Sequence, residues 1–317
     1  MVSHQINVGR PFDILGDVFE TLRFHGSIFF CSELAAPWGL ALESAGTPRF
    51  HIALTGNCYV GAKAGECLHV RSRNIVLFPN GPAHWIADQP GRPLVASERA
   101  GAACELGDPF FQQGEITHRL MCGLVRYDRE LAHPLLDALP HVMHFPQFEE
   151  TDPIWLTVML IEAQMRHMHD RRNPIVDRLA EALFLQLFNE HVNHHDDVTG
   201  FIAALRDRRV YKALRSIHRH PDVAWSLSSL SAKAGMSPAS LVRRFRDVIG
   251  MAPMSYVTHW RLMKAYNLIK YSQQPLERIA ASVGFSSART LSRAFERHYG
   301  SRPKALRRTH QETKSSA

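Results

Sequence analysis

The chain has 317 residues, a length that predicts two domains rather than one core. A hydrophobic fraction of 45% excludes wholesale disorder. No run of eighteen apolar residues is present, so a membrane span is not expected. The N-terminus lacks a secretory pattern, and five cysteines without framework spacing are typical of a reducing cytosol. We therefore expect a cytoplasmic protein.

The net charge of +7 conceals a strong asymmetry along the chain. Residues 205–317 carry 22 Lys and Arg against 6 Asp and Glu, whereas residues 1–204 carry 15 against 24. A solvated basic surface alone explains such a bias as well as a polyanionic partner does. All five cysteines (residues 31, 58, 67, 104 and 122) lie in the acidic part, so any thiol chemistry is expected there.

Three stretches follow one another in the pattern of apolar residues. Residues 12–130 contain short apolar runs broken by Gly and Pro, which predict a β-sandwich or barrel, with a long loop over the Gly-rich stretch 100–116. Two helices are predicted within 152–195, each with Pro near its first turn. HHDDVTG reads as a linker, and residues 201–309 are helical and basic.

An internal repeat dominates the basic stretch. LSSLSAKAGMSPASLVRRFRDVIGMAP, which starts at Leu227, matches LERIAASVGFSSARTLSRAFERHYGSRP, which starts at Leu276. Gly235 matches Gly284 at an offset of 49, and beyond this turn the offset is 50.

Each copy has the logic of a helix-turn-helix. The first helix ends at a Gly that suits a sharp turn, and Ser237 or Ser286 is expected to cap the second helix. Within that helix Leu and Phe lie four residues apart, facing inward, while arginines fall on another face. A helix laid in the major groove needs this arrangement. A helical hairpin with a charged outer face is the alternative for a single copy, and the duplication argues against it.

Through these motifs the sequence closely resembles the AraC family of transcription regulators over residues 211–309. The resemblance rests on AGMSPASLVRRFRDVIGMAPMSY, THWRLMKAYNLI and IAASVGFSSARTLSRAFERHYGSRPKALRR. It implies two helix-turn-helix units bridged by a rigid helix over about 253–271. Ser231 stands where the family usually has Ala.

The resemblance also places the base-reaching positions, to which we add Arg246 from the charged face of the first copy. The predicted DNA-binding residues are Ala239, Ser240, Val242, Arg243, Arg246, Ala288, Arg289, Thr290 and Arg293. Arg243 and Arg293 are the best candidates for base contacts, because bidentate Arg–guanine pairing is the commonest specific contact. A phosphate contact is the alternative for each.

The N-terminal part resembles the cupin-like sensor domain of one AraC subgroup. The order P-x-G-x-x-H in NIVLFPNGPAH resembles the second cupin motif, and RFHIALTG the strand of the first. The chain departs from the full cupin pattern: it has His51 alone instead of H-x-H, no matching Glu, and Arg73 where Gly is usual.

These departures leave a different set of possible metal ligands, namely Cys31, His51, His84 and Cys122. Two thiolates and two imidazoles suit tetrahedral Zn²⁺, and oxidation of the thiolates releases such a metal. No spacing in the sequence shows that the four converge, and buried core thiols and histidines are the alternative. A small organic effector in the barrel is the rival signal, with Trp38, Phe50 and Trp85 as candidate lining.

The sequence thus predicts an α+β protein: a cupin-like barrel over 1–145, a helical dimerisation or connecting region over 146–198, and an AraC-type all-α double helix-turn-helix domain over 205–310. We expect a regulator that binds double-stranded DNA and is not an enzyme. The alternatives are a cupin-type metalloenzyme tethered to DNA and a purely architectural DNA binder without sequence preference. We expect dimerisation through 152–195, because two linked copies raise the effective affinity for DNA. The family resemblance implies RNA polymerase as a further partner.

Overall fold

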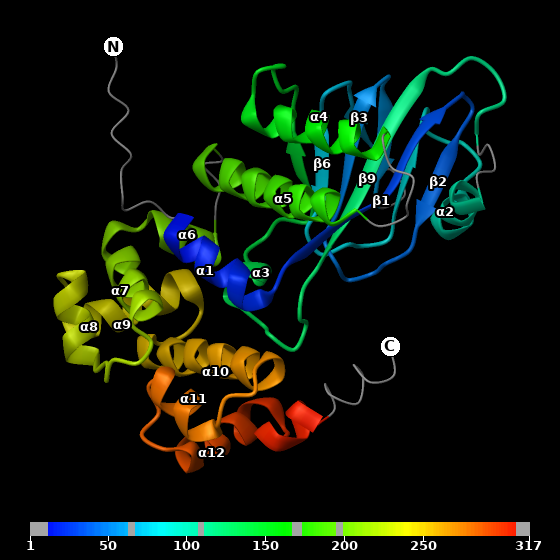
Figure 1. Cartoon of the computed structure of the whole chain (residues 1–317). Coiled ribbons are helices and arrows are strands. Elements are labelled where there is room, and N and C mark those ends of the chain that lie inside the picture. The colour runs from blue at the N-terminus through cyan, green and yellow to red at the C-terminus, as the bar shows by residue number, and fades with distance from the viewer. Residues whose placement is uncertain (1–11, 63–66, 107–110, 167–172, 195–198, 309–317) are drawn as a thin grey trace. The chain divides into compact units, whose positions relative to one another are not determined.

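The computed structural model describes residues 12–62, 67–106, 111–166, 173–194 and 199–308 (Figure 1). These residues group into two units. The barrel unit comprises the described parts of Phe24–Tyr127 and Leu139–Asp196. The helical unit comprises the described parts of Met1–Arg23, Asp128–Ala138 and Asp197–Ala317. The predicted sensor range 1–145 therefore contains two described segments, 12–23 and 128–138, that pack in the helical unit.

Two five-stranded sheets form the barrel unit. The first has the order β1 (His25–Leu34), β9 (His118–Arg126), β3 (Arg49–Thr55), β6 (Ile75–Phe78) and β10 (Met143–Phe145). The second has the order β5 (Leu68–Val70), β4 (Cys58–Gly61), β7 (His84–Ala87), β2 (Gly39–Leu42) and β8 (Val95–Ala96). A buried core that includes Phe30, Trp38, Val76 and Ile86 lies inside. The predicted sheet-rich fold is confirmed.

Three helices complete the barrel unit. Helix α5 (Pro174–His194) packs on β1 and β9, and α4 (Pro153–Arg166) packs on α5, as Figure 1 shows. Buried Glu162 of α4 forms ion pairs with Arg119 of β9 and with Arg166. Helix α2 (Ser97–Leu106) occupies part of the stretch that was predicted to be a loop, so the prediction of a long loop from 100 was wrong. Its apolar residues are mostly alanines that form no clear stripe, so the spacing of apolar residues did not predict this helix.

The helical unit contains the duplicated segment in the predicted order. It consists of α1 (Phe12–Leu22), α3 (Pro134–Asp137), α6 (Gly200–Arg206), α7 (Arg208–Arg219), α8 (Leu227–Ala234), α9 (Pro238–Ile249), α10 (Pro253–Tyr271), α11 (Leu276–Ser282) and α12 (Ala288–Tyr299). Helix α10 covers the range that was predicted for the bridging helix. In Figure 1 it runs between α8 and α9 on one side and α11 and α12 on the other.

Helix α1 is an element that the sequence analysis missed. Its apolar residues recur at helical spacing, and Ile14, Leu15, Val18, Phe19 and Leu22 are buried. The helix packs against α7 and α10, so a segment from the start of the chain covers the DNA-binding module. Residues 12–130 were interpreted as one β-rich stretch because short apolar runs follow α1 in the sequence. The helical spacing within residues 12–22 was therefore overlooked.

Candidate nucleic-acid interface and barrel cluster

The first helix-turn-helix consists of α8 and α9. Helix α8 ends at Gly235, whose left-handed backbone (φ +66°) makes the turn. Ser237 then caps α9, because its hydroxyl accepts a hydrogen bond from the Ser240 amide at 3.3 Å. Leu241 and Phe245 are buried, so the opposite face of α9 is left to solvent.

The second unit consists of α11 and α12. Its cap is Ser287, which accepts a hydrogen bond from the Thr290 amide at 3.1 Å, and not Ser286 as predicted. The extra residue in the second copy explains the error, because the offset of 50 that holds beyond the turn carries Ser237 onto Ser287. Leu291 and Phe295 are buried as expected.

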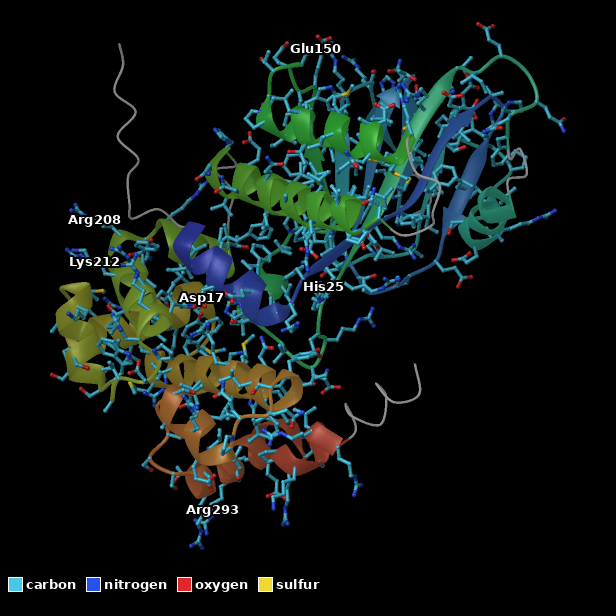
Figure 2. The ribbon with its side chains drawn as sticks, viewed as in Figure 1. Asp17, His25, Glu150, Arg208, Lys212 and Arg293 are labelled. Carbon is cyan, nitrogen blue, oxygen red and sulfur yellow. The ribbon has the colours of Figure 1, made fainter. Side chains whose placement is uncertain are left out.

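The predicted DNA-reaching residues are distributed over the outer faces of α9 and α12. Those with exposed side chains are Ala239, Arg243, Arg246, Arg289, Thr290 and Arg293, and those that are half-buried are Ser240, Val242 and Ala288. Figure 2 shows Arg293 projecting away from α12 into solvent. The hydroxyls of Ser240 and Thr290 lie 2.9 Å from the capping serines Ser237 and Ser287, so both hydroxyls also serve the helix start. Base contact at these positions stays a prediction.

Arginines cluster on α12. Arg289, Arg293 and Arg297 recur every fourth residue and, with Thr290 and Ala294, line a hollow of about 240 Å³. Such a stripe of guanidinium groups presents donors that fit phosphates and guanine edges. On α9 the neighbouring Arg244 behaves differently, because it forms an ion pair of 2.7 Å with Asp207, the N-cap of α7. Arg243 and Arg246 are therefore the exposed arginines that the first unit offers to DNA.

Inside the barrel, three of the four predicted metal ligands come together. His51 and Cys122 are register partners on β3 and β9, and His51 Nδ1 lies 2.9 Å from Cys122 Sγ. His51 Nε2 lies 2.8 Å from His84 Nε2, and His84 Nδ1 lies 2.7 Å from the Pro82 carbonyl oxygen. Cys31 lies on β1 opposite Met121, one register position away from Cys122.

The contact between His84 and the Pro82 carbonyl determines which atoms carry the protons in this barrel cluster (His51, His84 and Cys122). Because a carbonyl only accepts, His84 Nδ1–H donates to Pro82, which leaves His84 Nε2 as an acceptor. His51 Nε2–H then donates to His84, and His51 Nδ1 accepts from the Cys122 thiol. Burial lowers the pKa of His51 well below its ordinary value and that of His84 to about 4. The cluster is therefore neutral and saturated with hydrogen bonds.

Burial also raises the thiol pKa values in the barrel. The pKa of Cys122 lies well above its ordinary value and that of Cys58 is raised to about 12, both through desolvation. Burial raises the pKa of Cys31 as well, although Arg119 and Arg166 oppose this shift. Thiols in this state are protonated at neutral pH and react slowly with oxidants, because the thiolate is the reactive species.

The arrangement does not fit a zinc ion as it stands. His51 directs its two nitrogens at two different partners, while one imidazole gives one nitrogen to one ion. Among the residues that the structure describes, no group of three or more His, Cys, Asp or Glu is arranged to hold a metal. The donor set has the chemistry that zinc accepts, but the three side chains bond to one another instead.

The three residues of the candidate effector lining, Trp38, Phe50 and Trp85, have different surroundings. Trp38 belongs to the core that contains Cys122, whereas Phe50 alternates with His51 and points to the opposite side of the strand, where its ring contacts Gly123. Trp85 is half-buried. The three aromatic side chains therefore do not line one cavity together.

A barrel unit and a double helix-turn-helix define a two-part DNA-binding regulator. The cupin family profile matches residues 13–193, which is more than half of the chain, and a helix-turn-helix domain profile matches residues 230–309. The chain belongs to the cupin family through its N-terminal part and, with both parts together, is an AraC-type transcription regulator that binds DNA. No helix in the described residues is long and apolar enough to span a membrane.

Two regulators are similar to this chain along most of its length, and one solved structure is similar to its C-terminal part. The HTH-type transcriptional regulator AlkR of Acinetobacter baylyi is 28% identical over 307 residues, covering 93% of this chain and 99% of its own. The RCS-specific HTH-type transcriptional activator RclR of Escherichia coli is 24% identical over 258 residues, covering 80% and 82%. The DNA-bound DNA-binding domain of AdpA, a global transcriptional factor, is 26% identical with a TM-score of 0.33, covering 35% of this chain and 99% of that one.

Proposed function

We propose that this protein binds a specific DNA sequence through α9 and α12 and changes its transcriptional output in response to a signal at the barrel. The observation that carries the proposal is the pair of exposed arginine faces, with Arg243 on one recognition helix and Arg293 on the other. Both helices bury their Leu and Phe faces against the same unit, so the arginines are held on rigid elements. Two such helices in successive major grooves give sequence recognition.

The experiment is selection of a binding sequence from random DNA, followed by affinity measurements on every single-base variant. Arg243→Ala and Arg293→Ala are each expected to relax preference at one position by about 1–3 kcal/mol. Arg178→Ala serves as the control, because Arg178 lies on α5 and pairs with Glu181. If either arginine variant weakens all sequences alike and lowers the salt slope by about one, that residue contacts a phosphate. Failure to select any sequence refutes the proposal.

The signal is proposed to act on the barrel cluster. Substituting the neutral, hydrogen-bonded set His51–His84–Cys122 by a bound metal or by an oxidised thiol disturbs three strands of two sheets at once. Zinc held by these residues and Cys31 remains our proposal for the signal, and it requires the present hydrogen bonds to be replaced. A small organic effector in the barrel is the alternative.

Metal analysis of the purified chain distinguishes these signals. Stoichiometric zinc that disappears in Cys122→Ser supports the metal, and footprints that change with an added oxidant support sensing of oxidants. Zinc-free protein whose footprint ignores oxidant leaves the organic effector. Iron or manganese together with oxygen consumption would establish the tethered metalloenzyme instead.

Dimerisation is proposed through α4. This helix presents an apolar stripe of Leu156, Met159 and Leu160, whose exposed fractions are 54%, 44% and 47%. Leu156→Asp combined with Leu160→Asp is expected to convert a dimer into a monomer in sedimentation equilibrium. Val223→Asp is the control, because Val223 is also an exposed apolar residue but lies in the helical unit. A wild-type monomer at micromolar concentration contradicts this proposal. RNA polymerase as a partner and a cytoplasmic location remain predictions.

A further inference from the structure

Four side chains in the helical unit form an unbroken hydrogen-bonded chain. His133, which precedes α3, lies with Nε2 3.1 Å from the hydroxyl of Tyr256 on α10. The same hydroxyl lies 2.7 Å from Nε2 of His218 on α7, and His218 Nδ1 lies 3.0 Å from Asp17 on α1. We call this set the buried relay. It joins segments that are up to 201 residues apart in the sequence.

The groups at the two ends of the relay, the Leu135 amide and the Asp17 carboxylate, determine the direction of each hydrogen bond between them. The Leu135 amide donates to His133 Nδ1 at 3.1 Å, so His133 carries its proton on Nε2 and donates to Tyr256. At the other end the Asp17 carboxylate accepts from His218 Nδ1–H, so His218 Nε2 accepts from the Tyr256 hydroxyl. Desolvation lowers the pKa of both histidines, and this agrees with neutral rings. The Tyr256 hydroxyl thus accepts from His133 and donates to His218.

Tyr256 is also in contact with the first recognition helix. Its ring meets Phe245 of α9 edge-on at 5.7 Å and stacks with Phe201 of α6 at 6.1 Å. Phe245 is the inward anchor that lies two residues after Arg243. A displacement of the Tyr256 ring therefore changes the packing of α9, the helix that carries Arg243.

Both outer ends of the relay are covalently continuous with one strand pair of the barrel. Two residues separate the end of α1 at Leu22 from the start of β1 at His25, and one residue separates the end of β9 at Arg126 from the 128–138 segment. His25 and Arg126 are register partners, and the Asp128 amide donates to the Leu22 carbonyl at 3.1 Å. This strand pair carries Cys31 and Cys122, two of the predicted metal ligands.

We propose that Tyr256 is a positioning residue through which α1 and the 128–138 segment set the conformation of the first recognition helix. The inference rests on the proposed function only in that DNA is the ligand. Coupling between two sites is reciprocal, so DNA bound to α9 must alter the stability of α1 and of 128–138 to the same extent. This reciprocity makes a test possible without knowing the signal.

The test is hydrogen exchange, read by mass spectrometry, on the full-length chain with and without a DNA fragment obtained by the selection described above. In the wild type, DNA is expected to slow amide exchange in peptides from 13–22 and 129–137 by about fivefold or more. In Tyr256→Phe, which removes the hydroxyl and keeps the ring, this DNA-dependent difference is expected to vanish. Protection of α9 and α12 themselves is expected to persist.

The matched control is Tyr299→Phe. The Tyr299 hydroxyl is buried and has no hydrogen-bond partner among the residues that the structure describes, so the same chemical change is made in the same unit outside the relay. The wild-type response of α1 to DNA is expected to be retained in this variant. Asp17→Asn provides a second break in the relay should Tyr256→Phe fold poorly, and circular dichroism establishes folding in each case.

The outcomes separate this proposal from the proposed function. Wild-type protein that binds the selected DNA but shows no change in exchange at 13–22 and 129–137 overturns the relay while leaving the DNA-binding proposal intact. A DNA-dependent change that survives in Tyr256→Phe overturns it as well. If no sequence is selected at all, the proposed function fails first.

Discussion

Buried histidines form the same kind of hydrogen-bonded chain inside each of the two units. In the barrel cluster and in the buried relay, a neutral imidazole accepts at one nitrogen and donates at the other. The sequence analysis could name His51 and His84 because a cupin-like motif marks them. It could not name His133 or His218, because their partners lie 123 and 38 residues away and no local pattern records such contacts.

Acid is expected to destabilise the fold through these histidines. The pKa of His84 is lowered from about 6.5 to about 4 by burial, so between these values the unfolded chain binds one proton more than the folded chain. Its contribution to stability is complete above pH 6.5 and is lost as the pH falls toward 4. Between pH 7.5 and 5 the loss from His84 amounts to about 2 kcal/mol.

Urea unfolding at both pH values measures this dependence. His84→Gln is expected to reduce the difference in unfolding free energy between pH 7.5 and 5, and His141→Gln, at an exposed position, controls for the loss of a histidine. An unchanged difference in His84→Gln would show that His84 is not held neutral.

The two helix-turn-helix copies differ most at their turns. Gly235 and Gly284 both adopt a left-handed backbone, with φ of +66° and +83°. Open space surrounds the position of a Cβ on Gly235, whereas a Cβ on Gly284 would lie 2.5 Å from the Pro221 carbonyl oxygen and 2.7 Å from the Arg261 guanidinium. Arg261 is itself fixed there, since its Nε donates to the Pro221 carbonyl at 2.7 Å.

Alanine at the two turns is therefore expected to have unequal effects. Gly235→Ala carries only the cost of a left-handed residue, about 1 kcal/mol. Gly284→Ala adds a steric clash with backbone and is expected to cost at least about 3 kcal/mol and to weaken DNA binding by the second unit. Thermal unfolding of the two variants in parallel gives the comparison. Equal losses would contradict the close approach at Gly284.

The caps give a second comparison at this scale. Ser287→Ala is expected to cost about 1 kcal/mol, because it removes the acceptor for the Thr290 amide. Ser286→Ala removes only a hydroxyl that lies 3.3 Å from the Thr290 hydroxyl and is expected to cost less than about 0.5 kcal/mol. Urea denaturation resolves this difference. A larger loss of stability in Ser286→Ala than in Ser287→Ala would show that Ser286 is the cap, as the sequence predicted.

At the scale of the whole chain, the duplication and its position were predictable, because the periodicity of apolar residues and the repeat offset can be read directly from the sequence. The sheet-rich character of the N-terminal part was predictable for the same reason. The composition of the helical unit was not, because α1 and 128–138 join it through ion pairs between distant residues. Asp128 pairs with Lys270 at 2.7 Å across 142 residues, and Asp17 pairs with Lys264 across 247.

The discontinuous helical unit leads to a prediction about a fragment. A chain of residues 199–317 lacks α1 and 128–138, so Lys264 and Lys270 lose their carboxylate partners and the buried face of α1 is missing from α7 and α10. Side chains such as Val18 and Leu22 each contribute about 1.5–3 kcal/mol when fully buried. The fragment is expected to be less stable than the same residues in the full chain by several kcal/mol.

Amide exchange in α10 measures the difference, because protection there reports opening of the unit. Exchange in the fragment is expected to be at least about a hundredfold faster than in the full chain. Full chains with Lys264→Met and Lys270→Met separate the lost ion pairs from the lost apolar cover, and we expect these variants to recover most of the full-chain protection. Equal protection of α10 in fragment and full chain would show that α1 and 128–138 cover the DNA-binding module without stabilising it.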